Sequence, residues 1–192
     1  MNGKREMRKA NMVLAVTMIL LLIVHSAIGV LTLTGKTAGG QYVSKMVSHL
    51  FLTVISAHAV ISVILTVKSL SSVKRSGAPY MKENRMFWIR RISGLAILPF
   101  AFQHFWMFSP SFTEEGMVAP GFSGLDLAVS ILLAVCVIIH VASNIRPLSI
   151  SMGTEISRTL LLIAFALLAA GLVCLCWSFG YYFIHREALG AL

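Results

Sequence analysis

The feature that most constrains this 192-residue chain is a set of five long stretches without Asp, Glu, Lys or Arg. They are 19 to 27 residues long and cover 10–35, 46–67, 92–113, 127–145 and 159–185. A helix needs about 20 mostly apolar residues to cross a lipid bilayer. Since 57% of the residues are hydrophobic and only 12% are charged, the composition excludes a soluble enzyme, a disordered tail and a secreted disulfide scaffold.

We therefore predict an all-α fold, with a single domain over residues 1–192 that forms an integral membrane bundle of five transmembrane helices. The predicted helices cover about 11–34, 43–68, 87–109, 124–146 and 156–184. The first is expected to be retained rather than cleaved as a signal peptide, because its apolar stretch is longer than a signal core and has a histidine at its centre. The three cysteines all lie within the apolar stretches and give no disulfide framework.

The basic residues are distributed unevenly between the two sides of such a bundle. Of the 16 Lys and Arg residues, 13 fall in the N-terminal segment and in the connections after the second and fourth helices. An excess of Lys and Arg marks the cytoplasmic side, so the N-terminus is predicted to be cytoplasmic and the C-terminus outside. The net charge of +9 is then a consequence of topology and not a sign of nucleic-acid binding. The expected location is the bacterial cytoplasmic membrane.

Histidines occur within four of the five predicted spans. They are His25 on the first helix, His49 and His58 on the second, His104 on the third and His140 on the fourth. Ionisable residues inside a membrane are costly and are usually functional. At 1.5 Å per residue from the inner ends, the depths are about 21 Å for His25, 25 Å for His104, 15 Å for His58 and 9 Å for His140. The depths predict an outer pair, His25 with His104, and an inner pair, His58 with His140.

Two imidazoles at one level on facing helices are able to hold a metal between them. Neutral imidazole suits zinc, copper and iron, but a closed zinc site needs about four ligands, and neither level supplies a cysteine or carboxylate. Two imidazoles on opposite sides of a flat cofactor are what six-coordinate haem requires. Each pair is therefore predicted to bind one haem through the iron. Gly29, Gly94 and Ala101 would provide the room that haem needs between helices.

Polar side chains at helix ends near the inner pair are candidates for contacts with haem propionates. They are Arg90, Arg91, Ser93, Asn144 and Arg146. The positive-inside rule alone also explains the arginines. His49 is predicted to lie about 28 Å up, beyond the outer pair, where it would replace a ligand, contact the outer haem, exchange protons with a quinone or hydrogen-bond to water.

Two sequence motifs carry a resemblance to a known family. Arg91-Ile92-Ser93-Gly94, followed by nine residues and His104, resembles a helix of the cytochrome b subunits of succinate dehydrogenase and fumarate reductase. His140-Val-Ala-Ser-Asn144, followed by the segment 151–157, is similar to the fourth-helix signature of that family. The order of five helices with histidines on the first four also resembles its single-chain, di-haem branch. The resemblance covers roughly 25–158.

The resemblance implies a membrane anchor subunit of a quinone-linked oxidoreductase. Such a subunit holds two haems b, docks an iron–sulfur subunit and an FAD-containing flavoprotein on the cytoplasmic side, and exchanges electrons with a membrane quinone, expected to be menaquinone. It implies the ligand pairs His25/His104 and His58/His140. Polar or amphipathic residues near the outer pair are the candidates for quinone contacts: Gln41, Tyr42, His49, Trp106 and Ser109. These features equally fit anchors at the membrane interface.

Departures from the family pattern leave alternatives open. The interval from His25 to His58 is shorter than in the family, so His49 remains an alternative ligand. Ile145 stands where the family often has glycine, and the segment 35–45 contains no acid to accept a proton from a quinone. The alternative functions are the same di-haem subunit serving a flavoprotein reductase with another acceptor, a membrane transporter or proton channel, and a haem-free anchor or assembly protein.

Overall fold

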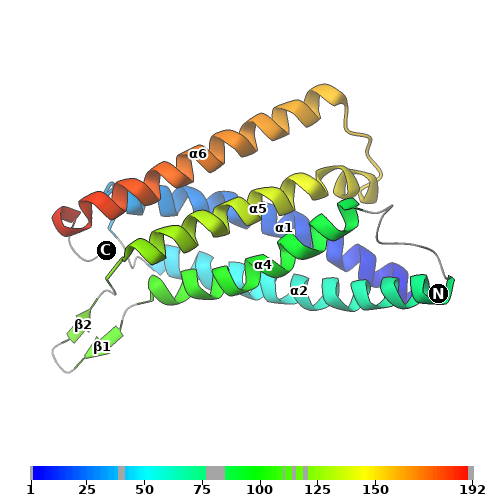
Figure 1. The fold of residues 1–192 in the computed structure, drawn as a ribbon, viewed down its shortest axis with the longest axis horizontal. Coiled ribbons are helices and arrows are strands. Elements are labelled where there is room, and N and C mark those ends of the chain that lie inside the picture. Colours follow the sequence, from blue (N-terminus) through cyan, green and yellow to red (C-terminus); the bar gives the residue numbers. More distant parts are fainter. Residues whose placement is uncertain are drawn as a thin grey trace.

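The computed structural model describes residues 2–38, 42–76, 85–109, 111–113, 116–118 and 121–189. Within them the chain forms long helices and one short hairpin, which lie lengthwise beside one another (Figure 1). The elements are α1 (Asn2–Leu33), α2 (Tyr42–Ser76), α4 (Arg85–Met107), β1 (Ser111–Thr113), β2 (Gly116–Val118), α5 (Gly124–Ser151) and α6 (Arg158–Leu189).

Four of the described helices are long enough and apolar enough to cross a membrane. The qualifying segments are Arg5–Leu33, Tyr42–Ser71, Gly124–Ser151 and Arg158–Arg186. The remaining long helix, α4, is not among them, although it was predicted as a span. It has 23 residues, with Arg85, Arg90 and Arg91 among the first seven, and contains Pro99. The helical, membrane-type bundle is thus present, with four helices that qualify rather than five.

The large apolar side chains on the outside of the helices are those that lipid would cover. Leu20 on α1 is 61% exposed, and Leu162 and Ile184 on α6 are 68% and 74% exposed. A helix that turns apolar side chains outward along its length is unfavourable in water but suits a hydrocarbon surrounding, where the backbone bonds are satisfied within the helix. The exposed surface therefore agrees with the hydropathy of the four spans.

The helices differ in their ends from the predicted ranges. α1 begins at Asn2 and α2 continues to Ser76, because a helix does not have to end where its residues become polar. α5 continues past Arg146 and through Pro147 to Ser151. It ends in a turn where Gly153 has φ +75° and the Ser149 hydroxyl donates to the Thr154 carbonyl at 2.7 Å. Such a positive φ is favourable for glycine because it has no Cβ.

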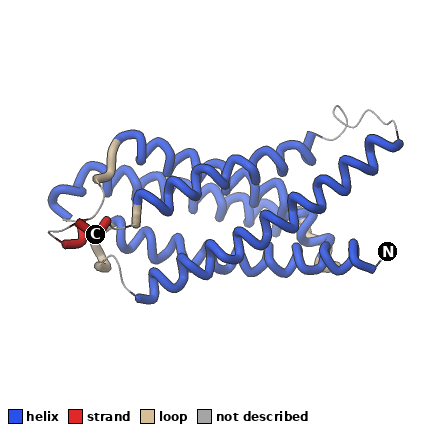
Figure 2. The backbone as a smooth tube through the Cα atoms, turned by 90° about the horizontal axis from the view of Figure 1, so that it is seen from below, coloured by secondary structure: helices blue, strands red, loops and turns tan. Residues whose placement is uncertain are grey.

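A small antiparallel hairpin is an addition to the predicted all-α fold. β1 pairs with β2, with Ser111 opposite Val118 and Thr113 opposite Gly116. Figures 1 and 2 show this hairpin at one end of the bundle and the N-terminal end of α1 at the other. We call these the hairpin end and the basic end. The basic end also contains the C-terminal ends of α2 and α5 and the N-terminal ends of α4 and α6 (Figure 1), and therefore gathers most of the Lys and Arg residues.

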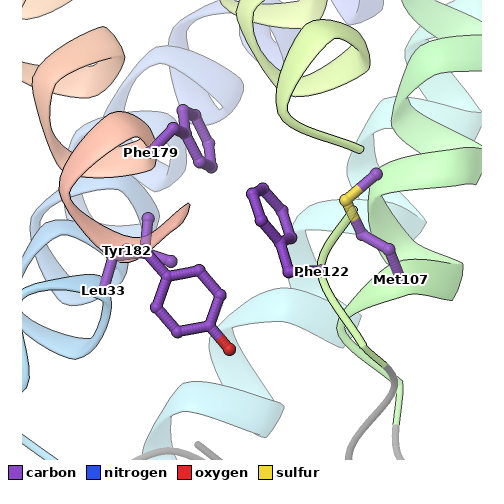
Figure 3. Close-up of a cluster of buried hydrophobic side chains, with 5 residues drawn as sticks. All are labelled: Leu33, Met107, Phe122, Phe179 and Tyr182. Atoms are coloured by element: carbon purple, nitrogen blue, oxygen red, sulfur yellow. The ribbon is translucent and has the colours of Figure 1, made fainter. Parts of the chain in front are cut away.

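A compact apolar cluster closes the bundle near the hairpin end. Leu33 of α1, Met107 of α4, Phe122 before α5, and Phe179 and Tyr182 of α6 are all at most 6% exposed and pack together (Figure 3). Because the cluster joins three helices and the segment that leads into α5, it sets their spacing at this end. Phe122 and Tyr182 have ring centroids 5.2 Å apart in an edge-on arrangement, a geometry that aromatic pairs favour.

α5 begins with a capping box. The Ser123 side chain accepts from the backbone N–H of Asp126, while the Asp126 carboxylate accepts from the backbone N–H of Ser123 at 2.9 Å. Replacing Ser123 by alanine is expected to lower the stability by about 1 kcal/mol, since the first turn loses its cap. Thermal unfolding in detergent measures the change. Ser71→Ala, which removes only a bond to the Val67 carbonyl, is the control, and an equal loss in both variants would contradict a role for the cap.

Candidate functional site

The first histidine pair lies toward the hairpin end and joins α1 to α4. The rings of His25 and His104 have centroids 6.1 Å apart and planes at 76°. These are the two residues that the depth estimate puts at the outer level. Aromatic rings surround the pair: Phe51 lies 5.5 Å from His25, and Phe108 and Phe179 lie 5.0 and 6.2 Å from His104. The His104 Nδ1 is buried and has no hydrogen-bond partner.

The second pair lies closer to the basic end and consists of His58 on α2 and His140 on α5. His58 and His140 are near enough to interact electrostatically, and Arg91 is within the same range of both. The Nε2 of His58 lies 3.3 Å from the Ser62 hydroxyl, which in turn donates to the Asn11 side chain at 2.9 Å. The Nδ1 of His58 is buried without a hydrogen-bond partner. Polar groups from α1, α2, α4 and α5 therefore converge at this level.

The His140 ring rests in a cradle formed by one turn of α4. Its Nδ1 lies 3.1 Å from the Arg90 carbonyl oxygen and 3.2 Å from the Ser93 hydroxyl. A Cβ on Gly94 would lie 2.9 Å from Cε1 and 3.1 Å from Nδ1 of the ring. Only a residue without a Cβ allows this approach, so Gly94 is the small residue that makes room for a histidine. Gly29, which was expected to have a similar role, has no such neighbour within 4 Å.

The candidates for propionate contacts are placed differently from one another. Arg91 is partly buried near the inner pair, with its guanidinium 5.1 Å from the Phe87 ring centroid. Ser93 is 7% exposed; its hydroxyl donates to the Ile89 carbonyl, and its oxygen lies 3.2 Å from the His140 Nδ1. Asn144 donates to the His140 carbonyl at 2.7 Å. Arg146 is exposed. Of this set, Arg91 is the cation that the fold brings to the inner histidines.

The quinone candidates are not gathered into one described site. Tyr42 is 81% exposed and Trp106 is 67% exposed. His49 is exposed as well; its Nδ1 lies 2.7 Å from the Lys45 carbonyl, and its ring lies edge-on to Phe105 at 6.4 Å. The Ser109 hydroxyl donates back to the Phe105 carbonyl, as is usual for a serine at a helix end. Gln41 lies outside the described residues.

The described residues contain no group of three or more His, Cys, Asp or Glu side chains that would hold a metal ion. The histidines come together as pairs instead. Cys136 and Cys176 are partly exposed and Cys174 is exposed; all three are free thiols.

Several polar partners of the histidines were not foreseen from the sequence. Ser62 follows His58 by four residues, and this helical spacing was a usable signal. Ser48 of α2, whose hydroxyl lies 3.4 Å from the His25 Nδ1, and Asn11 of α1 come from other helices. No local pattern connects them with the histidines that they serve, because the rotation of each helix decides which side chains meet.

Comparison with known proteins gives no further guide to the chain. No family model, curated protein or solved structure matches it.

Proposed function

We propose that this protein is a di-haem cytochrome b, the membrane anchor subunit of an oxidoreductase of the succinate dehydrogenase and fumarate reductase type. The observation that supports the proposal most directly is that His25 and His104, from two helices, have ring centroids 6.1 Å apart, while His58 and His140, from two others, lie within electrostatic range of each other. The motif resemblance around Ser93-Gly94 and His140 supports the choice of family.

The His25/His104 pair has a separation that suits a metal held between two imidazoles. Metal–nitrogen bonds of about 2.0–2.1 Å to two opposite rings put the ring centroids roughly 6 Å apart. The centroids of this pair are 6.1 Å apart, and the rings of Phe108 and Phe179 lie beside His104. Among the described residues no group of three or more His, Cys, Asp or Glu side chains is found, so His25 and His104, and likewise His58 and His140, would hold the cofactor by two imidazoles, and the porphyrin would supply the remaining nitrogens.

The inner pair has polar neighbours that fit a haem with charged propionates. Arg91 lies within electrostatic range of His58 and His140, and a guanidinium is suited to pairing with carboxylates. The Arg90 carbonyl and the Ser93 hydroxyl bond to the His140 ring. Oriented imidazoles with such partners are typical of metal-ligating histidines.

Haem b, when bound, supplies a reversible one-electron carrier at each level. The paired histidines would hold the carriers at two depths, the hydrogen bonds of His140 would orient its imidazole, and the aromatic residues beside the outer pair would cover it. Apolar helices around them provide a low dielectric, which together with the axial ligands and nearby charges tunes the potential. The arrangement suits electron transfer along the bundle, between a quinone in the membrane and an iron–sulfur and flavoprotein pair bound at the basic end, taken as the cytoplasmic end.

The purified protein is expected to contain two haems b per chain. A dithionite-reduced minus oxidised spectrum, with the haem-to-polypeptide ratio from a pyridine haemochrome assay, measures this directly. Co-purification of a flavin-containing protein would support the partner assignment. A preparation from haem-replete cells that contains no haem would exclude the di-haem function and favour a haem-free anchor or a transporter.

A further inference from the structure

The hydrogen bonds of the His140 ring determine which of its nitrogens carries the proton. The Arg90 carbonyl oxygen, 3.1 Å from Nδ1, is able only to accept a hydrogen bond. The Ser93 hydroxyl, 3.2 Å from the same nitrogen, donates its own proton to the Ile89 carbonyl at 2.7 Å, so its oxygen also accepts from the ring. A lone pair on Nδ1 would face two oxygen lone pairs, whereas an Nδ1–H satisfies both.

We infer that Ser93, together with the Arg90 carbonyl, is a positioning residue that holds His140 in its Nδ1–H tautomer and leaves Nε2 as the nitrogen that binds the metal. The metal-binding part of this inference rests on the proposed function, whereas the tautomer does not. Contact with Gly94 fixes the ring in place, since a Cβ there would come within 2.9 Å of Cε1. The hydroxyl thus acts through the imidazole and not on the cofactor.

A weaker form of the same arrangement occurs at the outer level. The Ser48 hydroxyl donates to the Ser44 carbonyl at 2.9 Å, and its oxygen lies 3.4 Å from the His25 Nδ1. By contrast, the His104 Nδ1 is buried with no hydrogen-bond partner. Of the four paired histidines, His140 is therefore the one whose Nδ1 lies near two oxygen acceptors. The electron donation of its imidazole to a bound metal should change most when one of these acceptors is removed.

An N–H that donates to an oxygen raises the basicity of the imidazole as a ligand and stabilises the oxidised metal. Ser93→Ala is therefore expected to keep both haems and to shift the midpoint potential of one of them upward, leaving the other unchanged. Ser93→Thr, which retains the hydroxyl, should restore the potential. Ser56→Ala is the matched control, because Ser56 makes the same kind of bond to the carbonyl four residues earlier, Leu52, and no bond to a histidine is recorded for it.

Two readouts separate this inference from the proposed function. The haem content of the full-length wild-type protein tests the function, and redox titration of the variants tests the role of Ser93. Nitrogen-15 NMR of the reduced, histidine-labelled full chain reads the tautomer whether or not haem is present. The His140 ring is identified as the one whose nitrogen resonances shift in Ser93→Ala and return to their wild-type positions in Ser93→Thr. In the wild-type protein its protonated nitrogen should be Nδ1. An Nε2–H at that position, or unchanged midpoint potentials in a haem-containing Ser93→Ala protein, would overturn the inference.

Discussion

Replacement of His25, His58, His104 or His140 by alanine is expected to remove one of the two haems in each single variant. Each residue belongs to one of two pairs, and loss of one axial imidazole leaves a site that holds the cofactor with a single ligand. The predicted haem-to-polypeptide ratio falls from two to one, with the reduced spectrum at half its intensity. The two single variants of one pair should lose the same haem, because the two histidines of a pair form one site.

The control for this series is His49→Ala, which is expected to retain both haems. The His49 ring is exposed on α2, its Nδ1 is bonded to the Lys45 carbonyl, and its neighbouring ring is Phe105 rather than another histidine. If His49→Ala loses a haem while His58→Ala retains both, then the ligand that α2 supplies is His49 and not His58. The pairing proposed here would then be wrong.

Substitution of Gly94 by alanine is expected to have an equally large effect on the inner pair. The added Cβ would lie 2.9 Å from the Cε1 of His140 and 3.1 Å from its Nδ1, closer than van der Waals contact allows. The ring or α4 must move, at a cost of about 1–3 kcal/mol for overpacking, and His140 then loses the position that brings it within electrostatic range of His58. We expect one haem per chain instead of two, and a lower midpoint of thermal unfolding.

The matched control is Gly171→Ala on α6. A Cβ at Gly171 would meet nothing within 4 Å, so this variant makes the same chemical change in a helix without the contact. It should retain both haems and unfold at or above the wild-type temperature, since alanine is the better helix former. Two haems in Gly94→Ala would contradict the close packing of α4 against the His140 ring.

Hydropathy was sufficient for the helical class and for four of the spans, because each of those helices is apolar over the thickness of a bilayer. It was not sufficient for α4, because Arg85, Arg90 and Arg91 lie within its first seven residues, and a helix of 23 residues then has too short an apolar part to qualify. The extension of α2 to Ser76 was also missed. A polar helical segment beyond the membrane has no hydropathy signal, since helix bonds are local and require no apolar face.

The two levels of histidines followed from the rise per residue along antiparallel helices, which needs only the sequence and the helix ends. That arithmetic puts His25 beside His104, and their rings lie 6.1 Å apart. It says nothing about the direction in which a ring points. His49 is on the same helix as His58, at a different predicted depth, and its side chain is exposed; the rotation of α2 about its axis, which depth does not give, decides which of the two faces a neighbouring helix.

The sequence by itself determined the helical membrane class and the concentration of positive charge at one end, and it predicted which histidines share a level, because these depend on composition and on distance along a helix. The tertiary structure alone decided which residues support them. Gly94, Ser93 and the Arg90 carbonyl of α4 meet His140 of α5. The meeting depends on how the two helices are rotated and packed against each other, and packing between distant segments leaves no local pattern in the chain.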